Sequence, residues 1–176
     1  MIAFLGGTIG NLLPQERIRL LAVLADQMSA GDFLLLGADL VKDPDRLVAA
    51  YADSAGITAA FNRNMLHVLR RELGAEVDPE AFDHLAVWDP DQEWIEMRLR
   101  SARDQVVRVL DLGVPFPTGA ELRTEISAKF RPKRIAQELR AAGLHATRRW
   151  ADSAGDYAVI LAAPTATDGV AGHRPR

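Results

Sequence analysis

The start of the chain holds the pattern that most restricts the fold. A short apolar run, Ile2 to Leu5, ends at Gly6 and Gly7, and Pro14 then begins a segment with apolar residues at helical spacing. A second, continuous apolar run follows at residues 33–36, as is typical of strands covered on both faces. A strand, a helix and a strand in this order predict a βαβ unit with two parallel strands in one sheet.

The middle of the chain has a different pattern. Residues 43–52 and 58–73 are predicted to be helical, and segments between 82 and 112 alternate at period two, which predicts strands. An apolar stripe on the second helix consists of Phe61, Leu66, Leu69 and Leu73. The strand block is expected to end at Gly113, Pro115 and Pro117. From Pro132 the chain returns to a helix, followed by two strands around a turn at 153–156. We therefore expect an α/β fold interrupted by an inserted α+β segment with its own small sheet.

Composition excludes several classes of function. The net charge of -3, without a block of lysine and arginine, predicts no nucleic-acid partner. The absence of cysteine excludes disulfides, zinc–thiolate sites and cysteine nucleophiles. The apolar runs are too short to span a bilayer, and the first residues lack the basic stretch of a signal peptide. These features predict a cytoplasmic protein with no membrane partner.

The glycine pair has two interpretations that the residues alone leave open. Gly6 and Gly7 follow a predicted parallel strand, where open α/β sheets bind ligands, and Asn11 could hydrogen-bond such a ligand. Alternatively, the segment is a tight turn in which Asn11 caps the helix. The segment GGTIGN matches neither the dinucleotide-binding nor the phosphate-loop pattern, so nucleotide phosphate binding is not predicted.

A second candidate group lies near the end of the middle block. In ELRTEISAKF, Glu125 and Ser127 are two residues apart and share a face if the segment is extended. A carboxylate and a hydroxyl suit a ligand with ring nitrogens, such as imidazole, although surface charge on an edge strand is the more common meaning of this pattern. Tyr51 is equally compatible with a core position on a helix. We expect no metal site, since the four histidines lack ligand spacing and are predicted to be scattered on the surface: His67, His84, His145 and His173.

Several motifs together resemble a known family. The helix and two strands at the end of the chain, with ELRAAGL and GDYAVILAA, look like the end of a class I methyltransferase that depends on S-adenosylmethionine (SAM). FLGGTIGNL, LLLGADLVKD, LVAAYADSAGITAAFNRN and TEISAKFRP resemble the histidine-specific methyltransferase family of ergothioneine biosynthesis, over residues 2–163. The resemblance implies a partial class I (Rossmann-like) methyltransferase sheet with an inserted α+β substrate-binding domain.

The resemblance also implies roles for individual residues. Asn11 would hold the amino-acid end of the substrate histidine, Tyr51 its carboxylate, and Glu125 with Ser127 its imidazole ring. Gly6 and Gly7 would contribute to the binding of SAM, the methyl donor. No residue is assigned as a catalytic acid, base or nucleophile, because the implied reaction depends on positioning.

The domain division follows from the same resemblance. Residues 1–42 and 129–164 are expected to form an incomplete methyltransferase domain, 43–128 the inserted substrate-binding domain and 165–176 a disordered tail. The glycine-rich SAM loop and the ribose-binding acid of the fold cannot be placed in this sequence. We therefore expect the C-terminal part of a monomeric enzyme, inactive alone. The alternatives are a module that binds histidine or a small amine without catalysis, and a methyltransferase for another amine.

Overall fold

The structure, a computed structural model, describes residues 1–165. Its contacts divide the chain into two compact units. Unit 1 combines residues 1–40 with the described residues from Phe130 onward, and unit 2 comprises Val41–Lys129. The expected tail lies outside the described residues except for Thr165, whose backbone N–H donates to the Gly143 carbonyl at 2.8 Å.

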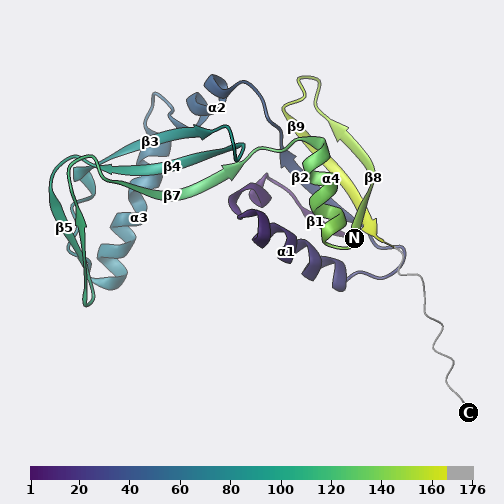
Figure 1. The fold of residues 1–176 in the computed structure, drawn as a ribbon, viewed down its shortest axis with the longest axis horizontal. Coiled ribbons are helices and arrows are strands. Elements are labelled where there is room, and N and C mark those ends of the chain that lie inside the picture. The colour runs from purple at the N-terminus through teal and green to yellow at the C-terminus, as the bar shows by residue number, and fades with distance from the viewer. Residues whose placement is uncertain (166–176) are drawn as a thin grey trace, which may run out of the picture. The chain divides into compact units, whose positions relative to one another are not determined.

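Unit 1 is built on a four-stranded sheet with the order β1-β2-β9-β8 (Figure 1). Its strands are β1 (Ile2–Phe4), β2 (Leu34–Asp39), β8 (Leu144–Ala151) and β9 (Tyr157–Pro164). The predicted parallel pairing of the first two strands is confirmed, with Ile2 opposite Leu34. The expected hairpin at the end of the chain is also confirmed, and β9 lies antiparallel between β2 and β8.

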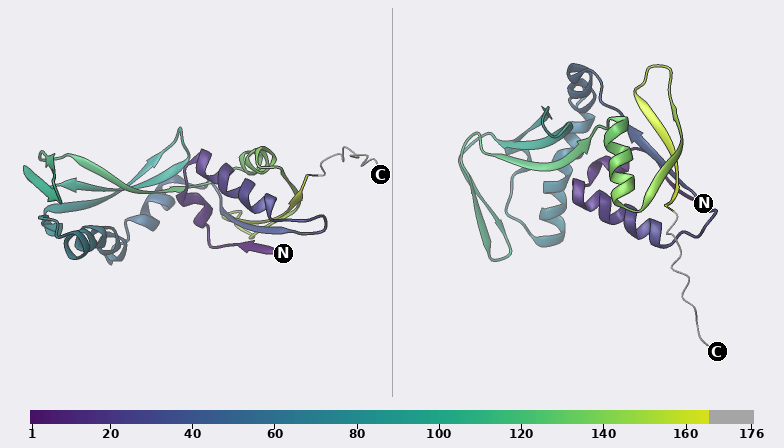
Figure 2. Two further views of the ribbon diagram at one scale, coloured as in Figure 1. Left: turned by 90° about the horizontal axis from the view of Figure 1, so that it is seen from below. Right: turned by 45° about the vertical axis from the view of Figure 1, so that its right-hand side comes forward.

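Two helices cover one face of this sheet. They are α1 (Pro14–Asp26) and α4 (Pro132–Ala141), and Figure 2 shows both on the same side of the strands. Each begins at the proline that the sequence predicts, because proline fits the first turn, where no N–H partner is needed. The helices bury Leu21, Ile135 and Leu139 against the sheet.

The first two strands differ from the expectation in their limits and burial. In β1, Ile2 and Phe4 are half-buried, and Leu5, which follows the strand, is 48% exposed. β2 begins at Leu34 rather than Phe33 and continues to Asp39. The difference arises because β1 is an edge strand of the described sheet, whereas β2 has neighbours on both sides.

Unit 2 has a three-stranded antiparallel sheet with the order β3-β4-β7. Its elements are α2 (Pro44–Tyr51), α3 (Ile57–Leu73), a short 3-10 helix η2 (Pro79–Ala81), β3 (Phe82–Asp89), β4 (Trp94–Ser101), β5 (Gln105–Val109), β6 (Leu112–Phe116) and β7 (Glu121–Ala128). A separate core lies between α3 and the strands, and consists of Leu66, Ala75, Val77, Phe82, Leu99 and Val107. The predicted helices and strands of this block are thus present, with a hydrophobic core of their own.

Two local predictions in unit 2 are wrong. Gly113 and Pro115 do not end the strand block but lie within β6, which pairs with β5 in a two-stranded hairpin. Proline is tolerated there because β6, in the described part of the chain, pairs with β5 alone and so has an edge that needs no backbone donor. On α3, Leu66 is buried as expected, but Phe61 is 65% exposed, so the apolar stripe is narrower than predicted.

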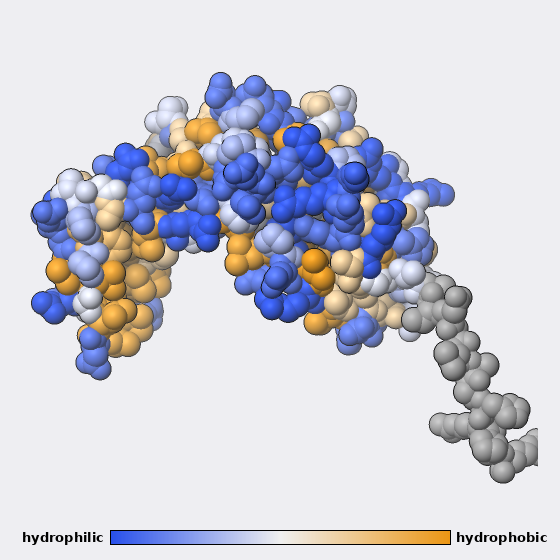
Figure 3. Space-filling model, in the orientation of Figure 1, coloured by the Kyte–Doolittle hydropathy of each residue, from blue (hydrophilic) through white to orange (hydrophobic). Residues whose placement is uncertain are grey.

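Exposed apolar side chains gather on the β5–β6 hairpin. Val106, Leu110 and Leu112 are more than half exposed there. Figure 3 shows this hairpin at the lower left, with hydrophobic residues on its surface. Among the described residues, no helix is long and apolar enough to cross a membrane.

Candidate functional site

Three polar groups meet at the end of β7. The Tyr51 hydroxyl donates to Ser127 Oγ at 2.7 Å, and Lys129 Nζ donates to Tyr51 Oη at 2.9 Å and to Ser127 Oγ at 2.8 Å. The Lys129 side chain also lies 4.8 Å from the centre of the Tyr51 ring. Lys129 is only 1% exposed and Ser127 only 9%, so these hydrogen bonds are shielded from water. The structure thus brings together Tyr51 and Ser127, two of the predicted site residues, and adds a lysine.

Tyr51 is also held through its backbone. It is the last residue of α2, and its carbonyl accepts a hydrogen bond from His84 Nε2 at 2.8 Å. The other ring nitrogen, Nδ1, accepts from the Asn62 side-chain amide at 2.9 Å, so the hydrogen of the neutral ring is on Nε2. Asn62 is held in turn by Thr124, whose hydroxyl donates to the Asn62 side-chain oxygen at 2.6 Å. The prediction that His84 is a surface histidine is therefore wrong.

A β-bulge in β7 decides where Glu125 and Ser127 point. Arg98 of β4 lies opposite Arg123, but the preceding residue, Met97, lies opposite Glu125, so Thr124 is the extra residue. Because side chains alternate between faces, the bulge places Arg123 and Glu125 on opposite faces of the sheet. Glu125 and Ser127 therefore share the face that carries Met97.

Glu125 lies in an environment unlike that of most surface carboxylates. It is half-buried beside Met97, and this burial raises the pKa of its carboxyl group above the ordinary value. A carboxylate that has lost much of its water gains from a hydrogen-bond donor. The position therefore suits the N–H of a ligand ring, as the sequence predicts.

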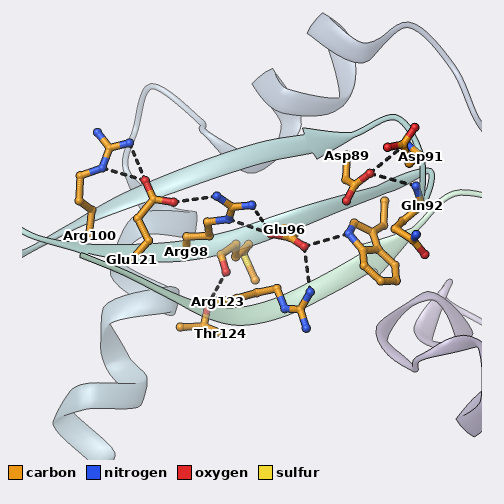
Figure 4. A network of polar contacts seen from close by, with 11 residues as sticks. Asp89, Asp91, Gln92, Glu96, Arg98, Arg100, Glu121, Arg123 and Thr124 are labelled. Carbon is orange, nitrogen blue, oxygen red and sulfur yellow. Dashed lines mark hydrogen bonds and ion pairs between the residues drawn. The ribbon is translucent and has the colours of Figure 1, made fainter. Parts of the chain in front are cut away.

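The opposite face of the same sheet carries a network of ion pairs, which Figure 4 shows. Glu96 is 5% exposed and accepts hydrogen bonds from Trp94 Nε1 at 3.1 Å, Arg98 Nε at 2.8 Å and Arg123 Nη1 at 2.9 Å. Arg98 also donates a hydrogen bond from Nη1 to Glu121 Oε2 at 2.7 Å. Glu96 and Glu121 are both paired with arginine, so we interpret these ion pairs as structural.

The glycine turn that follows β1 is open. Gly6 and Gly7 have left-handed φ angles of 80° and 74°, which favour glycine. A Cβ atom added at Gly7 would meet nothing within 4 Å, so a ligand could approach this backbone closely. Asn11 ends the 3-10 helix η1 (Thr8–Asn11), is exposed, and belongs to unit 1, whereas Tyr51, Glu125 and Ser127 belong to unit 2.

A buried ion pair anchors the segment that carries Asn11. Arg17 is 0% exposed and donates to both carboxylate oxygens of Glu138, at 2.8 and 2.6 Å. Its remaining nitrogen, Nη1, donates to the carbonyl of Leu12 at 2.7 Å, and its guanidinium lies 5.1 Å from the centre of the Phe130 ring. Arg17 thus fixes the backbone next to Asn11 from the first turns of α1.

Sequence reasoning missed Lys129, His84 and Arg17. Lys129 had a usable signal, because it follows Ser127 by two residues and so lies on the same side of the extended chain. The partners of Arg17 and His84 come from distant segments, and no local pattern marks them. In the described part of the chain, no group of three or more acidic or histidine side chains could hold a metal ion.

Comparison with known proteins identifies the family. The profile of a family described as "Histidine-specific methyltransferase, SAM-dependent" matches residues 1–164. The chain belongs to this family. The resemblance seen in the sequence motifs is thereby confirmed, and the α/β sheet of unit 1 agrees with the expected methyltransferase fold.

Two relatives of this histidine-specific methyltransferase family carry the name "Histidine N-alpha-methyltransferase". The protein of Mycolicibacterium smegmatis is 55% identical over 164 residues, covering 92% of this chain and 51% of the relative. The protein of Mycobacterium tuberculosis is 54% identical over 165 residues, covering 93% and 51%. The chain thus spans about half the length of these relatives. Among solved structures, the CcbJ methyltransferase from Streptomyces caelestis has a TM-score of 0.48 at 13% identity, covering 92% of this chain and 59% of that one.

Proposed function

We propose that the chain is part of an enzyme that transfers methyl groups from SAM to the α-amino nitrogen of histidine, in ergothioneine biosynthesis. The observation that carries the proposal is the cluster on unit 2. Tyr51 and Ser127 are 76 residues apart in sequence, yet their hydroxyls are 2.7 Å apart, and Glu125 lies on the same strand face as Ser127. The names of the two mycobacterial relatives support histidine as the substrate.

The roles of the four substrate-binding residues follow from this proposal. Glu125 accepts a hydrogen bond from the ring N–H of histidine, and Ser127 binds the other ring nitrogen. Tyr51 lies at the carboxylate end, where the positive charge of Lys129, bonded to its hydroxyl, attracts the carboxylate, and Asn11 holds the amino end. The first three roles are supported by the grouping within unit 2. The role of Asn11 rests on its motif alone.

The reaction needs positioning more than acid–base catalysis. SAM supplies a methyl group that its sulfonium already activates. The amino nitrogen attacks the methyl carbon in line, so that an N–C bond forms as the C–S bond breaks and the donor's sulfur leaves as a neutral thioether. A product nitrogen that still carries hydrogen then releases a proton to water. The chain's residues hold the neutral amine with its lone pair toward the methyl carbon. Holding two reactants in near-attack geometry can lower the barrier by roughly 7–11 kcal/mol.

The glycine turn in unit 1 leaves room for a ligand to approach its backbone. Its backbone is exposed in a left-handed conformation after a parallel strand, and side chains leave the approach to Gly7 open. We infer that Gly6 and Gly7 contact SAM through their backbone groups. The glycine-rich loop and the ribose-binding acid of the fold are not assigned to any residue of this chain. The cytoplasmic location and the monomeric state remain predictions.

The first test measures histidine binding by the 176-residue chain with isothermal calorimetry. We expect Ser127→Ala to weaken binding by about tenfold, as for one lost hydrogen bond. Ser54→Ala changes an exposed serine of unit 2 and serves as the matched control. Equal affinities of the Ser127→Ala variant and the unchanged chain would remove Ser127 from the site.

The second test measures catalysis. The chain is joined to the part of the M. smegmatis relative that it does not match, and incubated with SAM and histidine. We expect methylation of the histidine α-amino group, detected by mass spectrometry. Faster methylation of an amine without an imidazole ring would favour the alternative substrate class. Histidine binding without methyl transfer would favour a binding module.

A further inference from the structure

The hydrogen bonds around Ser127 restrict what this serine can offer to a ligand. A hydroxyl oxygen has two lone pairs and one hydrogen. Ser127 Oγ accepts one hydrogen bond from Lys129 Nζ at 2.8 Å and another from the Tyr51 hydroxyl at 2.7 Å. Both lone pairs are then in use, so Ser127 can meet a further partner only as a donor.

Lys129 is the residue that enforces this direction. An ammonium group has donors and no acceptor, so neither hydroxyl can donate to it. Tyr51 Oη accepts a hydrogen bond from Lys129 at 2.9 Å. The Tyr51 hydroxyl donates its own hydrogen bond to Ser127, since a phenol is the more acidic of the two hydroxyls. The backbone N–H of Lys129 donates to the Glu93 carbonyl at 2.8 Å, which holds the lysine at the end of β7.

We propose that Lys129 is a positioning residue that fixes Ser127 as a hydrogen-bond donor, so that Glu125 and Ser127 together select a ring with one N–H and one unprotonated nitrogen. This proposal rests on the proposed function, because it takes the ligand to be the histidine side chain. A carboxylate accepts and the fixed hydroxyl donates, and the neutral imidazole ring is complementary to both. A ring that has only N–H groups leaves the Ser127 hydrogen without an acceptor.

The direction of the Ser127 hydroxyl can be tested without any ligand. Neutron diffraction from deuterium-exchanged crystals of the chain locates hydroxyl deuterium atoms directly. We expect the Tyr51 deuterium between the two oxygens and the Ser127 deuterium pointing away from both Tyr51 and Lys129. A Ser127 deuterium aimed at Tyr51 Oη would overturn the proposal.

The role of Lys129 is tested by ligand preference. Histidine is compared with pyrrolylalanine, whose ring keeps an N–H but has no unprotonated nitrogen, by calorimetry on the full chain. We expect the unchanged chain to prefer histidine, and Lys129→Met to reduce that preference by about tenfold, the equivalent of one hydrogen bond. In Lys129→Met the lone pair that Tyr51 Oη gave to the lysine is free, so the Ser127 hydroxyl can turn and donate to it, and a pyrrole ring no longer leaves the Ser127 hydrogen without an acceptor.

Two further comparisons separate positioning from folding. Thermal unfolding checks that Lys129→Met remains folded, and Lys129→Arg, which keeps the charge and the donors, is expected to retain more of the preference. An unchanged preference in folded Lys129→Met overturns the role of Lys129 while histidine binding still supports the proposed function. If the unchanged chain does not bind histidine, both the proposed function and the ring selection are overturned. The neutron experiment reports the direction of the Ser127 hydroxyl in either case.

Discussion

Glu96 and Glu125 lie on opposite faces of one sheet, and their carboxyl pKa values move in opposite directions. Burial raises the pKa of Glu96, but hydrogen bonds from Arg123, Arg98 and Trp94 outweigh burial and hold that pKa below its ordinary value. Burial raises the pKa of Glu125. At the scale of single residues, the same side-chain type therefore has a structural role on one face and a proposed binding role on the other.

For Glu96 we predict a loss of stability in Glu96→Gln. The arginines would face an amide in place of a buried carboxylate, which costs about 1–3 kcal/mol in the free energy of unfolding. Because the folded pKa is depressed, this contribution is present above the ordinary value of 4.5 and is lost as the pH falls through the folded pKa. Urea unfolding at pH 7 and pH 4 measures both effects.

The matched control is Glu76→Gln, which alters a pair between Glu76 and Arg108 with side chains 76% and 65% exposed. An exposed pair of this kind contributes about 0–1 kcal/mol. Equal losses of stability in the two variants at pH 7 would show that burial gives Glu96 no special weight.

For Glu125 we predict a gain of stability together with a loss of binding. A raised folded pKa means that ionisation of Glu125 destabilises the folded state above the ordinary value of 4.5, so Glu125→Gln should raise stability at pH 7. The same change should weaken histidine binding by about tenfold. Urea unfolding and calorimetry on one preparation measure the two effects. Lower stability at pH 7 with unchanged affinity would contradict both parts.

At the scale of elements, strand β7 shows how far sequence patterns reach. The alternation in ELRTEISAKF correctly predicts a strand with Glu125 and Ser127 on one face. The same alternation would place Arg123 on that face too, and only the bulge at Thr124 separates them. A bulge depends on pairing with β4, which lies 20 or more residues away, so period-two reasoning cannot detect it.

The fold follows the same division between local and distant information. The prolines that begin α1 and α4 and the parallel pairing of β1 with β2 were predictable, because short sequence signals specify them. The hydrogen-bonded ion pair between Arg17 and Glu138 joins residues 121 positions apart, and no local sequence pattern near either residue predicts it. In the candidate site, sequence motifs predicted Tyr51, Glu125 and Ser127. The contacts of Lys129 and His84 were found only in the structure.

Within β2, Gly37 provides an element-scale prediction. A Cβ atom built on Gly37 would lie 2.0 Å from Tyr157 Oη and 3.3 Å from the Leu5 Cα, so Gly37→Ala forces the Tyr157 side chain to turn aside and presses on the backbone at Leu5. We expect a loss of about 1–3 kcal/mol in unfolding free energy. Chemical denaturation measures this loss. The double variant Gly37→Ala/Tyr157→Ala should recover part of it.

Gly113→Ala is the matched control, because it also adds a methyl group to a strand glycine. Its nearest neighbour would be 3.7 Å away, which is an ordinary contact. The change should be neutral or should stabilise by about 0.4–1 kcal/mol, because alanine has fewer unfolded conformations. A loss at Gly113 as large as that at Gly37 would refute the steric explanation.

At the scale of the whole molecule, the division into two units predicts separable folding. Unit 2 has its own three-stranded sheet and its own buried cluster around Phe82 and Leu99. We expect a peptide of residues 41–129 to fold alone, with dispersed amide signals in NMR spectra and a cooperative urea transition. The spectrum of the full chain serves as the reference. A collapsed amide spectrum for the peptide would show that unit 2 depends on unit 1.

The two backbone segments of unit 1 that flank unit 2 in the sequence pair with each other. Leu40 forms a parallel bridge with Phe130, and the Phe130 N–H donates to the Asp39 carbonyl at 2.8 Å. The intervening segment therefore starts and finishes at neighbouring points of the parent sheet. Doubling the length of such a loop costs only about 0.6 kcal/mol in closure entropy. Recombination could exchange the whole insertion for one of another size or specificity at this junction, and the sheet that receives it would keep its strand order.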